Sequence, residues 1–303
     1  MVESTAPSPS PLPTPVPATG TGAMSERARA RRELILLLLR RRAFLIGVVV
    51  LVIWVVCAVL GERITPYDPF NAFFLPGHQP PSPAHLFGTD RLGRDVLSRV
   101  MVGSRDVLIV APLAALLGVG VGTLLGLVMG YYRGIVDDIL SRVVEAFLAL
   151  PVILVALLTL VVLGSSSVVV VFVVGVLFAP IVARTVRSAV LSERQLDYVT
   201  AAKLRGETGL FILSREIFPN VLGPTVVEMT VRFGYAIFTV ATLSFLGVGL
   251  QPPSPDWGLT VSQEYANMIA GIWWPTLFPA LAIASTVIAI NLIADSLQSV
   301  LNE

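Results

Sequence analysis

The run Ala43-Phe-Leu-Ile-Gly-Val-Val-Val-Leu-Val-Ile-Trp-Val-Val-Cys-Ala-Val-Leu-Gly61 contains no charged residue and decides the class of fold. A helix needs about 20 apolar residues to cross a hydrocarbon layer of about 30 Å. Of all 303 residues, 55% are hydrophobic and 14% are charged, whereas soluble domains carry about 25% charged residues. This composition predicts an all-α, polytopic membrane protein.

Six apolar runs of this kind divide the chain. The third and fourth are joined by Gly164-Ser-Ser-Ser167 and should form a helical hairpin. Residues 168–174 are so rich in valine that propensity alone favours a strand, but backbone hydrogen bonding in lipid favours a helix. The spans are expected at 43–61, 107–131, 143–164, 167–185, 221–248 and 276–298.

The remaining segments are polar, and their arginines predict the orientation in the membrane. Residues 1–26 form a Pro/Ser-rich tail expected to be disordered, and 27–42 form a basic segment before the transmembrane domain at 43–303. Seven basic residues lie in 1–42 and six in 184–220, whereas 249–275 has none. The positive-inside rule then places both termini in the cytoplasm of a multi-pass cell-membrane protein. The formal net charge of +1 gives no support for nucleic-acid binding.

One polar loop, at 186–220, contains the signals of folded structure. Ser192 and Gln195 predict a capping box that starts a helix at Glu193. Gly206 is placed to end that helix as a C′ glycine. Thr208 can cap a second short helix, which Pro219 is expected to close before the fifth span.

The first of these short helices presents small residues to a partner. Ala201 and Ala202 give it a thin face that another surface could approach closely. From spacing alone, an amphipathic helix lying on lipid headgroups remains the alternative.

Several motifs together resemble one family. Ala201-Ala-x3-Gly206 followed by Ile217-x-Pro219 resembles the cytoplasmic EAA loop of ABC-importer permease subunits, with Thr200 where the consensus has Glu. The peptide-importer branch commonly shows this departure. Further segments that are similar to that branch lie at 87–99, 130–134, 148–151 and 243–258.

The resemblance is closest to the C-type permease of dipeptide and oligopeptide importers. It implies the six-helix fold of type I ABC importers and half of a translocation path for peptides. It also implies partners: a homologous B-type permease, ABC ATPase subunits and an extracytoplasmic binding protein. The loop would couple to the ATPase through residues that match the family motif, namely Thr200, Ala201, Ala202, Gly206, Ile217 and Pro219.

The chain is not expected to be an enzyme. A phosphate-cradling loop needs the pattern G-x4-G-K-[ST], and the chain's single lysine, Lys203, follows Ala202. ATP and Mg²⁺ would therefore be used by separate ATPase subunits, and this chain should bind no cofactor. His78 and His85 have no cysteine or third histidine nearby, so no metal site is expected.

Other polar residues leave two interpretations open. Glu228 and Arg232 in the fifth span are spaced to pair, either on the translocation path or as a structural pair. The alternating charges from Asp90 to Arg99 predict a helix, either interfacial and self-compensating or in contact with a partner protein. Trp257, Trp273 and Trp274 are expected at headgroup level.

The cargo also remains open. Relatives with the same machinery carry nickel chelates, glutathione or sugars. The motifs cannot separate these cargoes, because the external binding protein makes much of the selection. An ATP-independent secondary transporter is a competing class, but it predicts inverted repeats and broken spans with buried carboxylates, neither of which is found in the sequence.

Overall fold

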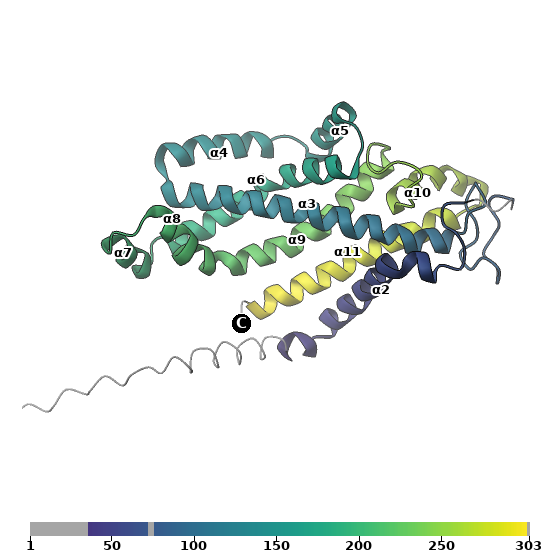
Figure 1. Cartoon of the computed structure of the whole chain (residues 1–303), viewed down its shortest axis with the longest axis horizontal. Helices are drawn as coiled ribbons and strands as arrows, with labels where there is room; N and C mark the ends of the chain where they lie inside the picture. The colour runs from purple at the N-terminus through teal and green to yellow at the C-terminus, as the bar shows by residue number, and fades with distance from the viewer. Residues whose placement is uncertain (1–35, 72–75, 302–303) are drawn as a thin grey trace, which may run out of the picture.

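The computed structural model describes residues 36–71 and 76–301. The tail expected at 1–26 and the first part of the basic segment at 27–42 lie outside these residues. Figure 1 shows a bundle of long helices that run roughly along one axis, with short helices at its two ends.

The long helices are α2 (Arg42–Ile64), α3 (Val96–Tyr132), α6 (Ser167–Glu193), α9 (Phe218–Phe245) and α11 (Trp274–Leu301). Shorter helices are α4 (Gly134–Leu148), α5 (Val152–Leu163), α7 (Asp197–Leu204), α8 (Gly209–Phe211) and α10 (Trp257–Glu264). A π-helical segment, Ile212–Ile217, joins α8 to α9, and a 3₁₀ segment, Tyr265–Ala270, follows α10. In Figure 1, α7 and α8 lie at one end of the bundle and α10 at the other.

The expected number of spans is confirmed. Five helical stretches are long and apolar enough to cross a bilayer, and the pair α4 and α5 makes a sixth if it is counted as one bent span. α5 and α6 are joined by a short turn at Gly164, as the hairpin prediction required. The valine-rich stretch at 168–174 is helical, as expected for a segment in lipid.

The third span is not the straight helix predicted at 143–164. α4 and α5 meet at an angle of 86° across the break at residues 149–151. Pro151 has no backbone N–H and disfavours helical geometry at the residue before it, which explains the break. The 12 residues of α5 cover about 18 Å, too little to cross the hydrocarbon layer alone.

The helix predicted to begin at residue 107 begins at Val96. The Asp95 side chain caps it by accepting a hydrogen bond of 2.8 Å from the Ser98 backbone N–H. Because of this cap, the helix extends three turns beyond the apolar run that predicted it.

The core of the bundle is the close packing of α3 on α6. Four glycines spaced four residues apart on α3 face α6, and they are Gly118, Gly122, Gly126 and Gly130. A Cβ atom at Gly122 would lie 2.5 Å from the Val182 Cβ and 2.6 Å from the Ala179 carbonyl oxygen. The absent side chains therefore let the two backbones approach closely, as in other helix pairs in membranes.

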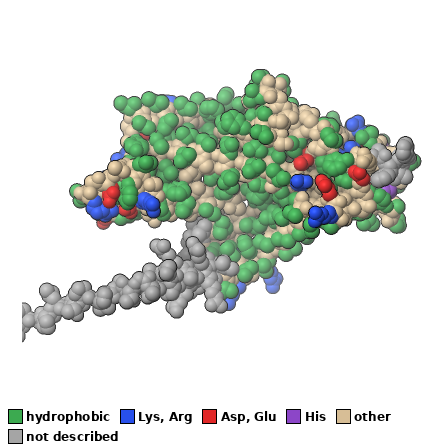
Figure 2. Space-filling model, in the orientation of Figure 1, with side chains coloured by type: hydrophobic (Ala, Val, Ile, Leu, Met, Phe, Trp, Pro, Cys, Tyr) green, Lys and Arg blue, Asp and Glu red, His purple; other side chains and the backbone are tan. Residues whose placement is uncertain are grey.

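Figure 2 shows where charge lies on one face of the molecule. Charged side chains gather mainly at the two ends of the bundle, around α7 at one end and near α10 at the other, with a broad hydrophobic band between them. This distribution fits a protein whose middle lies in lipid.

Candidate functional site

The coupling loop (residues 186–220) is built around α7. Gly206 adopts φ +77°, a left-handed conformation that favours glycine. The Gly206 N–H donates to the Lys203 carbonyl at 3.0 Å, and the Glu207 N–H donates to the Ala202 carbonyl at 3.2 Å. These two bonds form a Schellman motif, so the predicted C′ role of Gly206 is confirmed.

The predicted start of this helix is wrong. α6 continues to Glu193, and α7 begins at Asp197. The Ser192 hydroxyl donates back to the Ser188 carbonyl inside α6 and caps no new helix. The apolar packing of α6 on α3 carries that helix past the local capping signal.

The second short helix begins as predicted and then differs. The Thr208 hydroxyl accepts a hydrogen bond of 3.3 Å from the Phe211 N–H and caps α8. The chain then continues helically through the π segment Ile212–Ile217 into α9. Pro219 therefore does not close the element, because the helical path continues through it as the second residue of α9.

The two faces of α7 differ sharply in burial. Val199 and Ala202 are fully buried and pack with residues of α6, the π segment and α9, including Ile217. Ala202 and Ile217 are thus core positions, and the predicted thin face made by Ala201 and Ala202 together does not exist. From Leu196 to Gly206, the exposed residues are Leu196, Asp197, Thr200, Ala201, Lys203, Leu204, Arg205 and Gly206.

The loop presents two leucines to its surroundings. Leu204 is 85% exposed and Leu210 is 73% exposed. Arg205 lies between them and pairs with Glu216 at 3.1 Å. An exposed apolar pair beside a salt bridge is suited to contact with another protein.

Tyr198 stands at the junction of three segments. Its hydroxyl donates to the Glu193 carboxylate at 2.6 Å and accepts from the Asn220 amide at 3.1 Å. Asn220 also donates to the Glu216 carbonyl at 2.7 Å. Partial burial and the Glu193 carboxylate raise the pKa of Tyr198 to about 12, so its hydroxyl keeps its proton at neutral pH.

The end of α3 supports the loop from below. Tyr131 lies beneath the Arg194 guanidinium and the Lys203 ammonium, which are 5.9 Å and 6.0 Å from the centre of its ring. A Cβ atom at Gly209 would lie 3.1 Å from the Tyr131 ring. The Gly130–Gly134 motif therefore forms the floor of the coupling loop, a role that sequence reasoning did not predict.

The chain matches two known families of transport proteins. Residues 122–303, more than half of the chain, match the family of binding-protein-dependent transport system inner membrane components. Residues 32–81 match the N-terminal transmembrane domain of oligopeptide transport permease C. The chain belongs to this permease family.

Three curated relatives show how far the likeness extends. A Brucella suis protein named as a peptide transport system permease is 42% identical over 87% of this chain and 88% of its own length. The dipeptide transport system permease DppC of Escherichia coli K12 is 40% identical over 87% and 89% of the two chains. The glutathione transport system permease GsiD of another Escherichia coli strain is 38% identical over 83% of each chain.

Glu228 and Arg232 of the permease pair as their spacing predicted. Their side chains approach to 2.8 Å, and each is 13% exposed. The guanidinium also lies 4.8 Å from the centre of the Tyr235 ring and 5.9 Å from that of Phe178 on α6. The pair is thus compensated within the chain, and its place on a translocation path stays a prediction.

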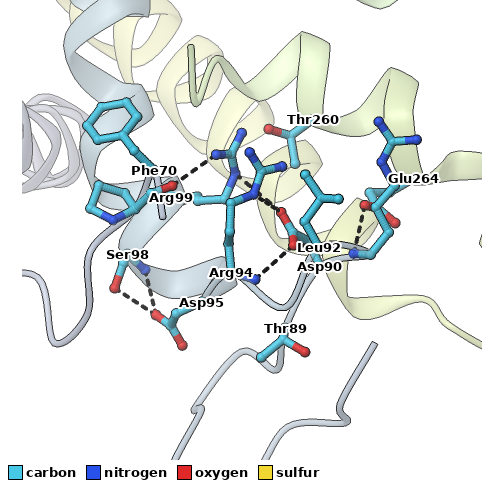
Figure 3. Close-up of polar contacts among 12 residues, drawn as sticks. Phe70, Thr89, Asp90, Leu92, Arg94, Asp95, Ser98, Arg99, Thr260 and Glu264 are labelled. Atoms are coloured by element: carbon cyan, nitrogen blue, oxygen red, sulfur yellow. Dashed lines mark hydrogen bonds and ion pairs between the residues drawn. The ribbon is translucent and has the colours of Figure 1, made fainter. Parts of the chain in front are cut away.

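At the end of the permease that carries α10, the charges from Asp90 to Arg99 do not form one helix, because α3 begins only at Val96. Figure 3 shows the side chains of Arg94 and Arg99 turned toward Asp90, whereas that of Asp95 turns toward Ser98. Arg94 pairs with Asp90 at 2.7 Å, and the Arg99 guanidinium donates to the Pro69 carbonyl at 3.0 Å. Asp90, Arg94, Asp95 and Arg99 are all buried, so this cluster holds the outer loops together.

This cluster also reaches α10. Glu264 is buried at 1% exposure and accepts from the Arg91 N–H at 3.1 Å. Its other oxygen lies 3.0 Å from the His78 imidazole, so His78 has a structural partner. The described residues contain no group of three or more acidic, histidine or cysteine side chains able to hold a metal ion.

Two of the three tryptophans expected at headgroup level are buried instead. Trp257 is 0% exposed and donates its indole N–H to the Val100 carbonyl at 2.8 Å. Trp274 is also buried and donates to the Thr89 carbonyl at 3.1 Å. Trp273 is 44% exposed, so its position at headgroup level stays a prediction. A composition rule for membrane interfaces cannot tell an anchor from a packing residue.

Asp256, which caps α10, gives the permease a pH-dependent stability. Its carboxylate accepts from the Leu259 N–H at 2.8 Å, and its second oxygen has no hydrogen-bond partner among the described residues. Burial raises the pKa of Asp256 to about 6, and Asp106 nearby adds to this.

We expect the wild-type permease to lose stability as the pH rises from about 4 to about 6. The folded state holds the Asp256 proton more tightly than the unfolded state does, so this contribution is complete near pH 4 and lost above the folded pKa of about 6. Asp256→Asn keeps an oxygen for the cap and removes the charge. At pH 7.5 its melting temperature should exceed that of the wild type by about 2 to 5 °C.

The measurement is thermal unfolding in detergent, followed by tryptophan fluorescence from pH 4.5 to 7.5. The two proteins should converge at the acid end of this range. Parallel curves with a constant offset would contradict the assignment to Asp256. Asp106→Asn removes the nearby charge that helps to raise the pKa of Asp256, so its loss of stability should be complete at a lower pH than in the wild type.

Proposed function

We propose that this permease is the transmembrane subunit of an ATP-driven importer for di- and oligopeptides. Membership of the binding-protein-dependent family and the names of the peptide and dipeptide permeases support this function. The relative named as a glutathione permease points to the same chemistry, because glutathione is itself a tripeptide. Nickel chelates and sugars receive no support from these relatives.

The coupling loop would dock on a separate ATPase subunit. The observation that carries this proposal is the outward face of α7, where Leu204 is 85% exposed next to the exposed Arg205. Leu210, on α8, is exposed as well. A short helix with an apolar face commonly binds by lying in a groove of its partner. The exposed motif residues, which are able to touch the partner directly, are Thr200, Ala201, Gly206 and Pro219. Ala202 and Ile217 would support them from within.

The remaining parts of the importer follow from this assignment. A homologous permease would complete the translocation path, and a binding protein would deliver peptides at the end that carries α10. ATP and Mg²⁺ would act in the ATPase, because the chain's one lysine is not in a phosphate-cradling loop. The arginines near α7 and before α2 support a cytoplasmic position for that end and for both termini.

Purification of the tagged permease in a mild detergent tests the docking role. We expect an ABC ATPase subunit to be recovered with the wild-type chain. Leu204→Asp places a charge on the proposed contact and should lower that recovery at least tenfold, since a buried unpaired charge costs several kcal/mol.

Leu158→Asp is not a suitable control, because α5 lies in the apolar band. Gln195→Asp is better suited, since Gln195 is an exposed residue of the same loop outside α7. It should leave recovery unchanged. Absence of any ATPase from the wild-type preparation would overturn the proposed function.

A further inference from the structure

A small group of polar residues joins α7 of the coupling loop to α6 and α9. This group, the Tyr198 latch, consists of Glu193, Tyr198 and Asn220. We propose that Tyr198 is a positioning residue that transmits movement of α7 to α9, a role that rests on the docking function proposed above.

The latch joins three elements through one hydroxyl group. Glu193 is the last residue of α6, Tyr198 is in the first turn of α7, and Asn220 is in the first turn of α9. The bond of 2.6 Å to the Glu193 carboxylate is charge-assisted and strong for its kind. The bond of 3.1 Å from Asn220 completes the link, so residues of α6 and α9 are both tied to the hydroxyl of one residue of α7.

The covalent route from α7 to α9 is much less direct. It passes the open turn at Gly206, the short helix α8 and the π segment Ile212–Ile217. π-Helical turns are rare and often lie at functional sites, because one extra residue is inserted into the helix. A force on α7 would be spread over these irregular turns, whereas the latch bypasses them.

Movement of Asn220 has a clear consequence further along α9. Glu228 follows eight residues later on the same helix, about 12 Å along its axis, and pairs with Arg232. α9 runs as one helix from Phe218 to Phe245, and Pro224 removes one backbone hydrogen bond between the two positions, the one that the Asn220 carbonyl would accept. The latch therefore connects the docking face to the charged pair inside the bundle.

Packing alone accounts for the stability of the loop. Val199 and Ala202 are fully buried against Ile212 and Ile217, independently of the latch. Glu193 and Asn220 are both partly or fully exposed, so water can replace the lost hydroxyl. Removing that hydroxyl should leave the loop folded and affect the transmission of movement.

The test uses the complete importer with its binding protein, reconstituted in liposomes. Tyr198→Phe keeps the ring and loses both latch bonds. We expect recovery of the ATPase to equal that of the wild type. The number of labelled di- and tripeptides imported per ATP hydrolysed should fall about three- to tenfold, as expected for the loss of two hydrogen bonds.

Two further variants make the result specific. Tyr265→Phe is the matched control, because Tyr265 lies far from the coupling loop, in the 3₁₀ segment after α10. Its side chain is 54% exposed and its hydroxyl makes no hydrogen bond among the described residues, so the import ratio should equal that of the wild type. Asn220→Ala should lower the ratio by itself but add little to Tyr198→Phe, since both break the same link.

The outcomes separate the latch from the function on which it rests. An unchanged import ratio for Tyr198→Phe, or additive effects of the two latch variants, would overturn the latch. Reduced ATPase recovery with Tyr198→Phe would also overturn it, because the residue would then act in docking. Failure of the wild-type chain to recover an ATPase or import peptide would instead overturn the proposed function.

Discussion

Ala202→Arg is expected to abolish peptide uptake by unfolding the coupling loop. Ala202 is 0% exposed and packs among Val199, Ile212 and Ile217, so no room exists for a longer side chain. A guanidinium there would be buried without a partner or would force α7 off its support, at a cost of about 3 kcal/mol or more. The loop should become sensitive to protease even when no ATPase is present.

Ala201→Arg is the matched variant one position away. Ala201 is exposed, so the added side chain can extend into solvent and the loop should keep its protease resistance. Uptake should still fall, because the bulk now lies on the face proposed to contact the ATPase. Limited proteolysis of the isolated permease separates the two effects. Equal protease sensitivity of the two variants would show that the assignment of buried and exposed faces is wrong.

Gly122→Leu is expected to prevent stable folding of the bundle. A Cβ atom at this position already lies 2.5 Å from the Val182 Cβ, and the Ala179 carbonyl oxygen blocks retreat at 2.6 Å. Since backbone atoms line the site, a side chain can enter only if α3 and α6 separate. Overpacking and the loss of this core interface should cost more than about 3 kcal/mol.

Gly120→Leu controls for the effect of leucine on the same helix. A Cβ atom at Gly120 meets no other atom within 4 Å, so the new side chain faces open space. The yield of monodisperse protein in detergent and its melting temperature are the measurements. Gly120→Leu should match the wild type in both, whereas Gly122→Leu should aggregate. Similar stability of the two variants would contradict the packing of α3 on α6.

The sequence predicted the candidate site better at its turns than on its faces. Gly206 and Thr208 act as predicted because a left-handed glycine and a capping hydroxyl depend on residues within one turn. The capping box at Ser192 was wrong, because α6 continues on its tertiary support. Tyr198 lies in the loop at 186–220, but its partner Asn220 is 22 residues away in the chain. No local pattern in the sequence predicts that contact.

In the outer loops, too, the sequence predicted local features but not tertiary contacts. Alternating charge from Asp90 to Arg99 correctly indicated mutual compensation, but it wrongly indicated a helix over the whole stretch, because α3 begins only at Val96. Arg99 finds carbonyl groups of Pro69 and Ser254, which lie far from it in the chain. Contacts between loops bury these charges, and no periodic pattern in the sequence predicts such contacts.

By itself, the sequence determined the membrane class, the number of spans, the end of α7 at Gly206 and the start of α8 at Thr208. Each of these depends on apolar length or on the backbone preferences of adjacent residues, which are local properties. Only the tertiary structure decided the bend between α4 and α5, the close approach of α3 and α6, and the burial of Ala202. These features arise when side chains distant in sequence compete for the same space, and that competition exists only in the folded chain.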